Sequence, residues 1–207
     1  MKVPLIVIGL CVLISLVPSA SRTVGLASDG YGLVTLAVLK GEEFSANPYD
    51  ANGYLLSPAA AVWMMKTFDY PYGRCSHLSE KINICGAPLV AWQGRMLNSI
   101  DDGQRSEGGA LAAEVDRAEQ RAYSLLAVLI ARGESVDAPL DGFTPLHQAV
   151  LFNNPKYFKL LLAAGADLQA RLDTPDADYH DLTVAQYIRF LEAKGLNDLS
   201  ELKRLAD

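Results

Sequence analysis

The pattern of apolar and polar positions is clearest in residues 141–170, and its first half predicts a short helix. Thr144 before Pro145 is typical of a helix start, because the Thr side chain can accept a hydrogen bond from a first-turn amide and Pro at the first helical position gives up no donor that the helix needs. The helix that follows extends to about Phe152. It ends at residues 153–155, Asn-Asn-Pro, which are typical of a turn.

A second helix is predicted directly after this turn. Apolar residues return at helical spacing at Tyr157, Phe158, Leu160, Leu161 and Leu162. Gly165 then provides the residue that most easily adopts the left-handed conformation in which many helices end. The segment therefore predicts two short antiparallel helices joined by a tight turn.

These two helices carry a sequence signature. The run DGFTPLHQA at residues 141–149 and the run LLLAAGAD at residues 160–167 resemble an ankyrin repeat, whose signature T-P-L-H-x-A recurs with a period of about 33 residues. The resemblance implies that Thr144 and His147 tie turns together through hydrogen bonds and that neither is catalytic. It also implies binding of another protein through the finger loops and the concave face of the first helices.

A repeat of this kind is expected to have neighbours, because roughly three units are needed to bury the two faces of each one. Upstream, residues 125–133 echo residues 159–165, and Gly133 precedes Gly165 by 32 positions. Residues 110–121 would supply the other helix of that unit.

Downstream, residues 182–188 resemble the start of a further repeat. Lys-Gly at residues 194–195 predicts a break, and residues 196–205 predict a last helix. Thr183 follows Thr144 by 39 positions, about six more than the period of the family. The sequence therefore predicts an insertion within this last unit.

We place the insertion in an enlarged finger loop at residues 171–181. The expected fold class is all-α, a short stack of ankyrin-like helix–turn–helix repeats. The three repeats occupy residues 108–139, 140–172 and 173–207, and the outer two are degenerate.

Residues 22–107 predict helices without the repeat signature. A short helix is expected at residues 32–40, and Ser-Pro at residues 57–58 is typical of a cap and first turn for a helix that continues to Phe68. A further helix is expected at residues 88–100. We favour a helical region that caps the N-terminal end of the stack, and the alternative is a set of degenerate repeats that extends it.

The pattern of residues 1–21 predicts a secretory signal peptide. Lys2 precedes an apolar run of 14 residues from Pro4 to Val17, and small residues follow at 18–21 as a cleavage site. The run is short for a membrane span. We expect a cleaved signal and a secreted or periplasmic protein without a membrane span after processing. The alternative is an uncleaved N-terminal anchor.

Removal of that segment leaves Cys75 and Cys85 as the remaining cysteines. An even number of cysteines in an exported protein predicts a disulfide between them, and two buried free thiols are the alternative. His77 lies nearby, but two thiols and one imidazole at this spacing do not form the paired motif of a zinc site.

Composition and charge narrow the class of partner. Half of the residues are hydrophobic, which suffices for a sizeable core, and 18 Lys and Arg against 24 Asp and Glu give a net charge of −6. Nucleic acids and anionic lipids are bound through clustered basic residues, and no basic run occurs in the chain. We therefore expect another protein as the partner, one with a basic surface patch.

Candidate catalytic residues are few. The three histidines are His77, His147 and His180, and none lies in a pattern such as H-E-x-x-H or G-x-S-x-G. We expect no enzymatic activity, no cofactor and no metal. A calcium loop in the enlarged finger is disfavoured, because the turn glycine and the terminal bidentate Glu of such loops are missing.

The predicted contacts with the partner come from the two fingers and the first helix of the clear repeat. They are Asp141, Phe143, Gln148, Phe152, Asp173, Asp176, Asp178, Tyr179 and His180. Tyr179 is expected to serve as an aromatic anchor in an acidic loop whose charge steers association.

The functional hypothesis is an exported protein-interaction module, specifically an immunity or inhibitor protein that covers the active site of a secreted toxin or effector enzyme. One alternative is a periplasmic scaffold or accessory protein of an envelope enzyme. An alternative from another class is an enzyme with its site in residues 22–107.

Overall fold

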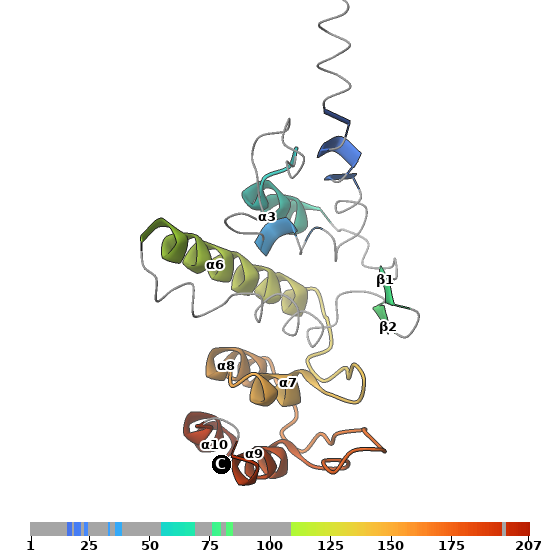
Figure 1. Ribbon diagram of the computed structural model, residues 1–207, viewed down its shortest axis with the longest axis vertical. Helices are drawn as coiled ribbons and strands as arrows, with labels where there is room; N and C mark the ends of the chain where they lie inside the picture. The colour runs from blue at the N-terminus through green and yellow to red at the C-terminus, as the bar shows by residue number, and fades with distance from the viewer. Residues whose placement is uncertain are drawn as a thin grey trace, which may run out of the picture. The chain divides into compact units, whose positions relative to one another are not determined.

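The computed structural model describes residues 16–17, 19–21, 23–24, 33, 36–38, 55–68, 76–79, 82–84, 109–195 and 198–207 (Figure 1). Most of these residues are helical, as the predicted all-α fold requires. The chain divides into two compact units. Unit 1 holds residues 1–86 and 100–125, and unit 2 holds residues 87–99 and 126–207.

In unit 1, the helix predicted after Ser57 is confirmed. Helix α3 covers Pro58–Thr67, and the Ser57 hydroxyl accepts a hydrogen bond from the Ala60 amide at 3.1 Å. Its buried side, which includes Ala61 and Met65, faces the core of the unit. The helix ends at Phe68, whose extended backbone leaves the helical conformation.

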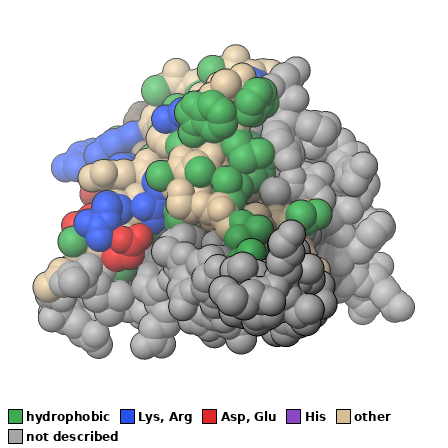
Figure 2. Space-filling model, turned by 90° about the horizontal axis from the view of Figure 1, so that it is seen from above, with side chains coloured by type: hydrophobic (Ala, Val, Ile, Leu, Met, Phe, Trp, Pro, Cys, Tyr) green, Lys and Arg blue, Asp and Glu red, His purple; other side chains and the backbone are tan. Residues whose placement is uncertain are grey.

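Large apolar side chains are also exposed in unit 1. They are Val17, Val24, Leu55, Trp63 and Phe68. The rings of Trp63 and Phe68 meet edge to face with centroids 5.5 Å apart. Figure 2 shows hydrophobic side chains gathered on the face that is seen from above.

A short β-hairpin in unit 1 was not predicted. Strand β1, Ser76–Ser79, pairs antiparallel with strand β2, Ile82–Ile84, and Ser76 lies opposite Ile84. Strands of four and three residues are too short to show an alternating pattern in the sequence. The two cysteines that flank the hairpin lie outside the described residues.

Helix α6, Gly109–Ala131, corrects the prediction of two helices in this part of the chain. It is one continuous helix of 23 residues, so residues 110–131 do not form a helix–turn–helix pair. The residues at the expected turn, Ala-Tyr-Ser at 122–124, include no Gly, Pro or Asn that would favour a break. A single buried stripe with helical spacing follows its length: Val115, Ala118, Ala122, Leu125, Leu126 and Leu129.

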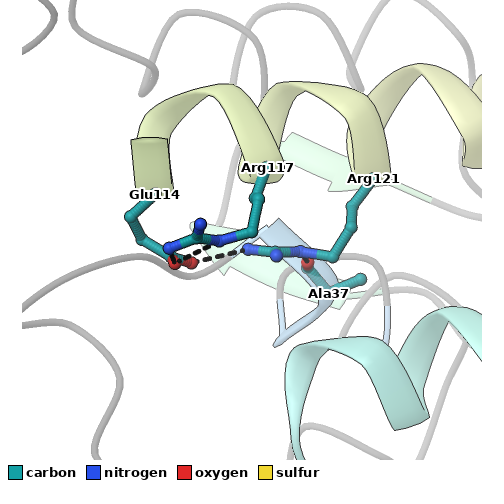
Figure 3. Close-up of polar contacts among 4 residues, drawn as sticks. All are labelled: Ala37, Glu114, Arg117 and Arg121. Atoms are coloured by element: carbon teal, nitrogen blue, oxygen red, sulfur yellow. Dashed lines mark hydrogen bonds and ion pairs between the residues drawn. The ribbon is translucent and has the colours of Figure 1, made fainter. Parts of the chain in front are cut away.

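Polar contacts on α6 fix a neighbouring segment within unit 1 (Figure 3). The Arg121 Nε donates to the carbonyl of Ala37 at 2.6 Å, and its Nη2 lies 3.2 Å from Glu114 Oε1. Arg117 binds the other oxygen of Glu114 at 2.7 Å. Burial acts to raise the pKa of Glu114, but the hydrogen bonds and positive charges of the two arginines outweigh it, and the pKa is lowered.

In unit 2, the helix pair of the clear repeat is confirmed. Helix α7 covers Pro145–Leu151 and helix α8 covers Pro155–Ala163. The Asn154 side chain accepts a hydrogen bond from the Tyr157 amide at 2.9 Å and caps α8. Gly165 has a φ of 91° and ends the pair in the left-handed conformation, as predicted.

A second helix pair packs against the first (Figure 1). Helix α9 covers Val184–Ala193 and helix α10 covers Ser200–Ala206, so the last helix begins about one turn later than expected. Helix α7 packs on α9 and α8 packs on α10, which places the two pairs in adjacent layers. An ion pair between Lys159 and Glu201, 2.7 Å long, joins α8 to α10 on the surface.

Other predictions fall mainly or wholly outside the described residues. They are the signal segment, the helix at residues 88–100 and the disulfide between Cys75 and Cys85. No helix in the part of the chain that the structure describes is both long and apolar enough to cross a membrane.

Candidate functional site: a groove below two fingers

The first finger is a tight turn at residues 140–143. The amide of Leu140 donates to the carbonyl of Phe143 at 2.9 Å, and the amide of Phe143 donates back at 3.0 Å. Asp141 and Gly142 have φ values of 50° and 80°, the left-handed pair that a type I′ turn requires. The sequence Asp-Gly favours this turn, which leaves the Phe143 side chain beside helix α9.

The second finger is the enlarged loop that was expected between the repeats. The Leu172 amide donates to the carbonyl of Leu182 at 3.1 Å, and the Asp181 amide donates to the carbonyl of Leu172 at 2.9 Å. The Arg171 guanidinium binds the Asp181 carboxylate at 3.0 Å. Within the loop, the Thr174 amide donates to Nδ1 of His180 at 3.3 Å. These bonds close the loop at its base.

The two fingers are joined to one another. The amide of Asp173 donates to the carbonyl of Gly142 at 3.0 Å. A Cβ atom added at Gly142 would lie 2.0 Å from the carbonyl oxygen of Asp173, closer than two such atoms can approach. Only glycine therefore allows this contact between the fingers.

His147 connects helix α7 to the base of the second finger. Its Nδ1 lies 2.7 Å from the Thr144 hydroxyl, and its Nε2 lies 3.2 Å from the carbonyl oxygen of Leu182. Because a carbonyl oxygen only accepts, these partners assign the proton to Nε2 and make Nδ1 the acceptor. Burial lowers the pKa of His147 to about 4, against the opposing effect of the Leu182 carbonyl.

Four aromatic rings from the fingers and α9 pack together. They belong to Phe143, Tyr179, Tyr187 and Phe190. Tyr179 lies 5.8 Å from both Phe143 and Tyr187 and 5.9 Å from Phe190, measured between ring centroids. Burial, followed by the electrostatic effect of the neighbouring Tyr179 phenol, raises the pKa of Tyr187 to about 12, so the Tyr187 phenol stays neutral. We call these four rings the aromatic cluster.

An open groove of about 610 Å³ lies over this cluster. It is lined by Phe143, Leu151, Ala177, Asp178, Tyr179, Tyr187, Phe190, Leu191 and Lys194. Leu151 on α7 keeps 37% of its surface exposed, and the lining is mostly apolar. The volume is within the range of about 300–1,000 Å³ that is common for ligand sites. We call this the finger groove, since both fingers and both first helices contribute to it.

Charged groups lie at one end of the finger groove. The Lys194 Nζ is 5.2 Å from the centroid of the Phe190 ring and 3.7 Å from Oδ2 of Asp178. Both side chains are well exposed, at 54% for Lys194 and 82% for Asp178. The groove therefore combines an aromatic floor with an ion pair that water can reach.

The structure brings some of the predicted contact residues together. Phe143, Asp178 and Tyr179 line the finger groove. Asp141, Asp173, Asp176 and His180 are exposed on the fingers but do not line it. Tyr179, which we expected to serve as an aromatic anchor, is half-buried among other rings.

On helix α7, neither predicted residue lines the groove. Gln148 is half-buried, and Phe152 is 40% exposed where the helix ends.

Four groove residues at α9 were missed in the sequence: Tyr187, Phe190 and Leu191 on the helix, and Lys194 directly after it. Tyr187, Phe190 and Lys194 follow one another at intervals of three and four residues, which places them on one face of the helix. This spacing could have indicated a binding face in the sequence, but the same spacing is also typical of a helix face that is buried in the core. The contact between the rings of Tyr187 and Phe143, which lie 44 positions apart in the sequence, shows that this face of α9 packs against the first finger.

No metal site is present among the residues that the structure describes. No group of three or more His, Cys, Asp or Glu side chains is placed there to hold an ion. Asp178 and Asp181, two of the carboxylates of the second finger, instead pair with Lys194 and Arg171.

Comparison with known protein families agrees with this geometry. The family model of the ankyrin repeat matches residues 141–172, which include most of the first finger and all of helices α7 and α8. Comparisons with curated proteins and with solved structures found no match. The chain thus contains an ankyrin repeat, a class of module that mediates contacts between proteins. The implied partner is another protein.

Proposed function

We propose that this protein binds its protein partner through the finger groove. The observation that carries the proposal is the groove itself, an accessible and mostly apolar site of about 610 Å³ next to the matched repeat. Accessible apolar surface on a folded protein commonly marks an interaction site. Aromatic side chains such as those of Phe143 and Phe190 are frequent anchors in protein interfaces.

We further propose that the protein is exported and acts as an immunity or inhibitor protein for a secreted toxin or effector enzyme. The sequence of residues 1–21 supports export. A small acidic protein with hydrogen-bonded fingers is suited to block the entrance of an active site that carries basic groups. In this proposal the protein itself is not an enzyme. The hydrogen bonds at both ring nitrogens of His147 support that view, since they engage this imidazole in the fold.

Capture of partners from a bacterial envelope with the purified protein tests the groove. Phe190→Ala removes a ring of the floor and is expected to weaken capture by about tenfold or more. Phe152→Ala is the matched control, because Phe152 is an exposed Phe of the same unit that does not line the groove. Equal capture by wild type and Phe190→Ala would show that the partner binds elsewhere.

The enzymatic activity of the captured partner distinguishes the inhibitor hypothesis from the scaffold hypothesis. An inhibitor abolishes the partner's enzymatic activity in proportion to the amount added. A periplasmic scaffold or accessory protein co-purifies with an enzyme that stays active. If the purified protein leaves the product of an adjacent toxin-like gene fully active, the immunity role is excluded.

A further inference from the structure

We infer that the finger groove recognises an arginine or lysine of the partner, held between the Phe190 ring and the Asp178 carboxylate, beside an apolar residue on the aromatic floor. The inference rests on the proposed function, because it defines the chemistry of the partner at the same groove. The occupant is therefore a protein segment in which a basic residue adjoins an apolar one.

The position of Lys194 shows that the groove accepts a cation. Its ammonium lies 5.2 Å from the centroid of the Phe190 ring and 3.7 Å from Oδ2 of Asp178. The face of an aromatic ring attracts a cation within about 6 Å of its centroid, and the carboxylate adds a charge of opposite sign. The chain's own lysine thus occupies the position where a partner's basic group would bind.

Lys194 is held loosely enough to be displaced. A separation of 3.7 Å from Asp178 exceeds the length of a hydrogen bond, and both side chains are more than half exposed. Ion pairs with these properties contribute little to stability. An arginine can form two parallel hydrogen bonds to a carboxylate while it stacks on a ring, so a partner's guanidinium would bind this position better than the lysine does.

Charge around the groove favours a basic partner over an acidic one. The second finger, residues 171–181, contains four aspartates and one arginine, Arg171, which pairs with Asp181. An acidic segment would meet these carboxylates at short range, where like charges repel. The floor beside the charged end is apolar, since Phe143, Leu151 and Tyr187 line it. This surface suits the apolar neighbour of the basic residue.

Selection from a displayed library of random peptides tests the inference with the full chain. Peptides are selected on the wild type and depleted on Phe190→Ala. We expect the enriched sequences to place Arg or Lys next to Leu, Phe or Trp. A labelled peptide from this set is then titrated against each variant by fluorescence anisotropy.

Lys194→Gln removes the internal competitor and is expected to tighten peptide binding by about threefold to fivefold. In the Lys194→Gln background, Asp178→Asn is expected to weaken binding by about fivefold. Lys159→Gln is the matched control for lysine removal, because Lys159 is 53% exposed and also pairs with one carboxylate, that of Glu201, outside the groove. It should leave the affinity unchanged.

The outcomes separate this inference from the proposed function. Enriched peptides that are acidic, or weaker binding by Lys194→Gln, would overturn the basic-residue inference and leave the groove as a protein-binding site. Failure to enrich any peptide that depends on Phe190 would overturn both.

Discussion

At the residue scale, a few residues in the turns and at the start of helix α7 determine the shape of the candidate site. Gly142 allows the two fingers to touch, and His147 ties helix α7 to the base of the second finger. Asp141, Asn153 and Asp181 adopt positive φ values at turns, where Asp and Asn tolerate the left-handed conformation better than most residues. Gly142 and the three residues with positive φ act through the conformation of the backbone, and His147 acts through its imidazole.

Gly142→Ala is expected to lower the free energy of unfolding by about 2 kcal/mol or more. The added methyl group would combine a φ of 80° with a 2.0 Å approach to the Asp173 carbonyl oxygen, and a backbone atom cannot simply rotate away. Gly165→Ala is the matched control, since its φ is 91° and a Cβ there meets nothing within 4 Å. Urea unfolding curves should show a loss of about 1 kcal/mol for the control. Equal losses for the two variants would contradict the close contact between the fingers.

His147 makes stability depend on pH. Its pKa is about 4 in the folded protein and 6.5 as the ordinary value, so the unfolded chain binds more protons between these limits. The stabilisation is complete above about pH 6.5 and is lost as the pH falls toward 4. Urea unfolding at about pH 7 and about pH 4.5 should therefore differ by about 2–3 kcal/mol from this residue. His147→Gln is expected to reduce the difference by that amount, and an unchanged pH dependence in the variant would refute the assignment.

At the scale of elements, the helix pairs α7–α8 and α9–α10 of unit 2 share the same arrangement but differ in the residues at equivalent surface positions. A shift of 39 positions aligns Thr144 with Thr183, and it aligns His147 with Gln186. Gln186 is exposed and accepts a hydrogen bond from the Thr183 amide at 2.8 Å, so it caps its own helix instead of reaching another finger. The same shift aligns the buried Val150 with the exposed Arg189. A polar face of this kind is typical of the end of a stack.

Arg121 on helix α6 binds residues 36–38 of unit 1 through the carbonyl of Ala37. Arg121→Ala would leave the Ala37 carbonyl without a charged donor that binds it at 2.6 Å, and it is expected to lower the free energy of unfolding by about 1.5–3 kcal/mol. Arg117→Ala is the control, since Arg117 is 58% exposed and its pair with Glu114 lies on the surface. That variant should lose at most about 1 kcal/mol. Thermal unfolding monitored by circular dichroism would rank the two variants, and equal losses would contradict a stabilising role of the hydrogen bond from Arg121 to Ala37.

At the scale of the whole molecule, export and disulfide formation can be tested together by counting thiols. The chain has three cysteines, and Cys11 lies within the predicted signal. We expect the denatured, unreduced protein from the exported fraction to contain no free thiol. One thiol would indicate a bridge with an uncleaved signal, and two would indicate cleavage without a bridge.

The sequence alone determined the helix pair of residues 145–163 and the start of α9, because their caps and breaks are local. Thr144-Pro145, Asn154-Pro155 and Gly165 act within one turn of the helices that they begin or end. The sequence was misread at α6, where a likeness to the second helix of the repeat suggested a turn that no local residue favours.

Only the tertiary structure decided where the site lies. Phe143, Tyr179 and Tyr187 are separated by 36 and 8 positions, yet their rings are about 6 Å apart because the Gly142 and Asp173 backbones bring the fingers together. Sequence spacing placed Tyr187 and Phe190 on one face of α9, but an apolar helix face can be either core or binding surface. The fingers cover only part of this face of α9. The uncovered part lines the finger groove.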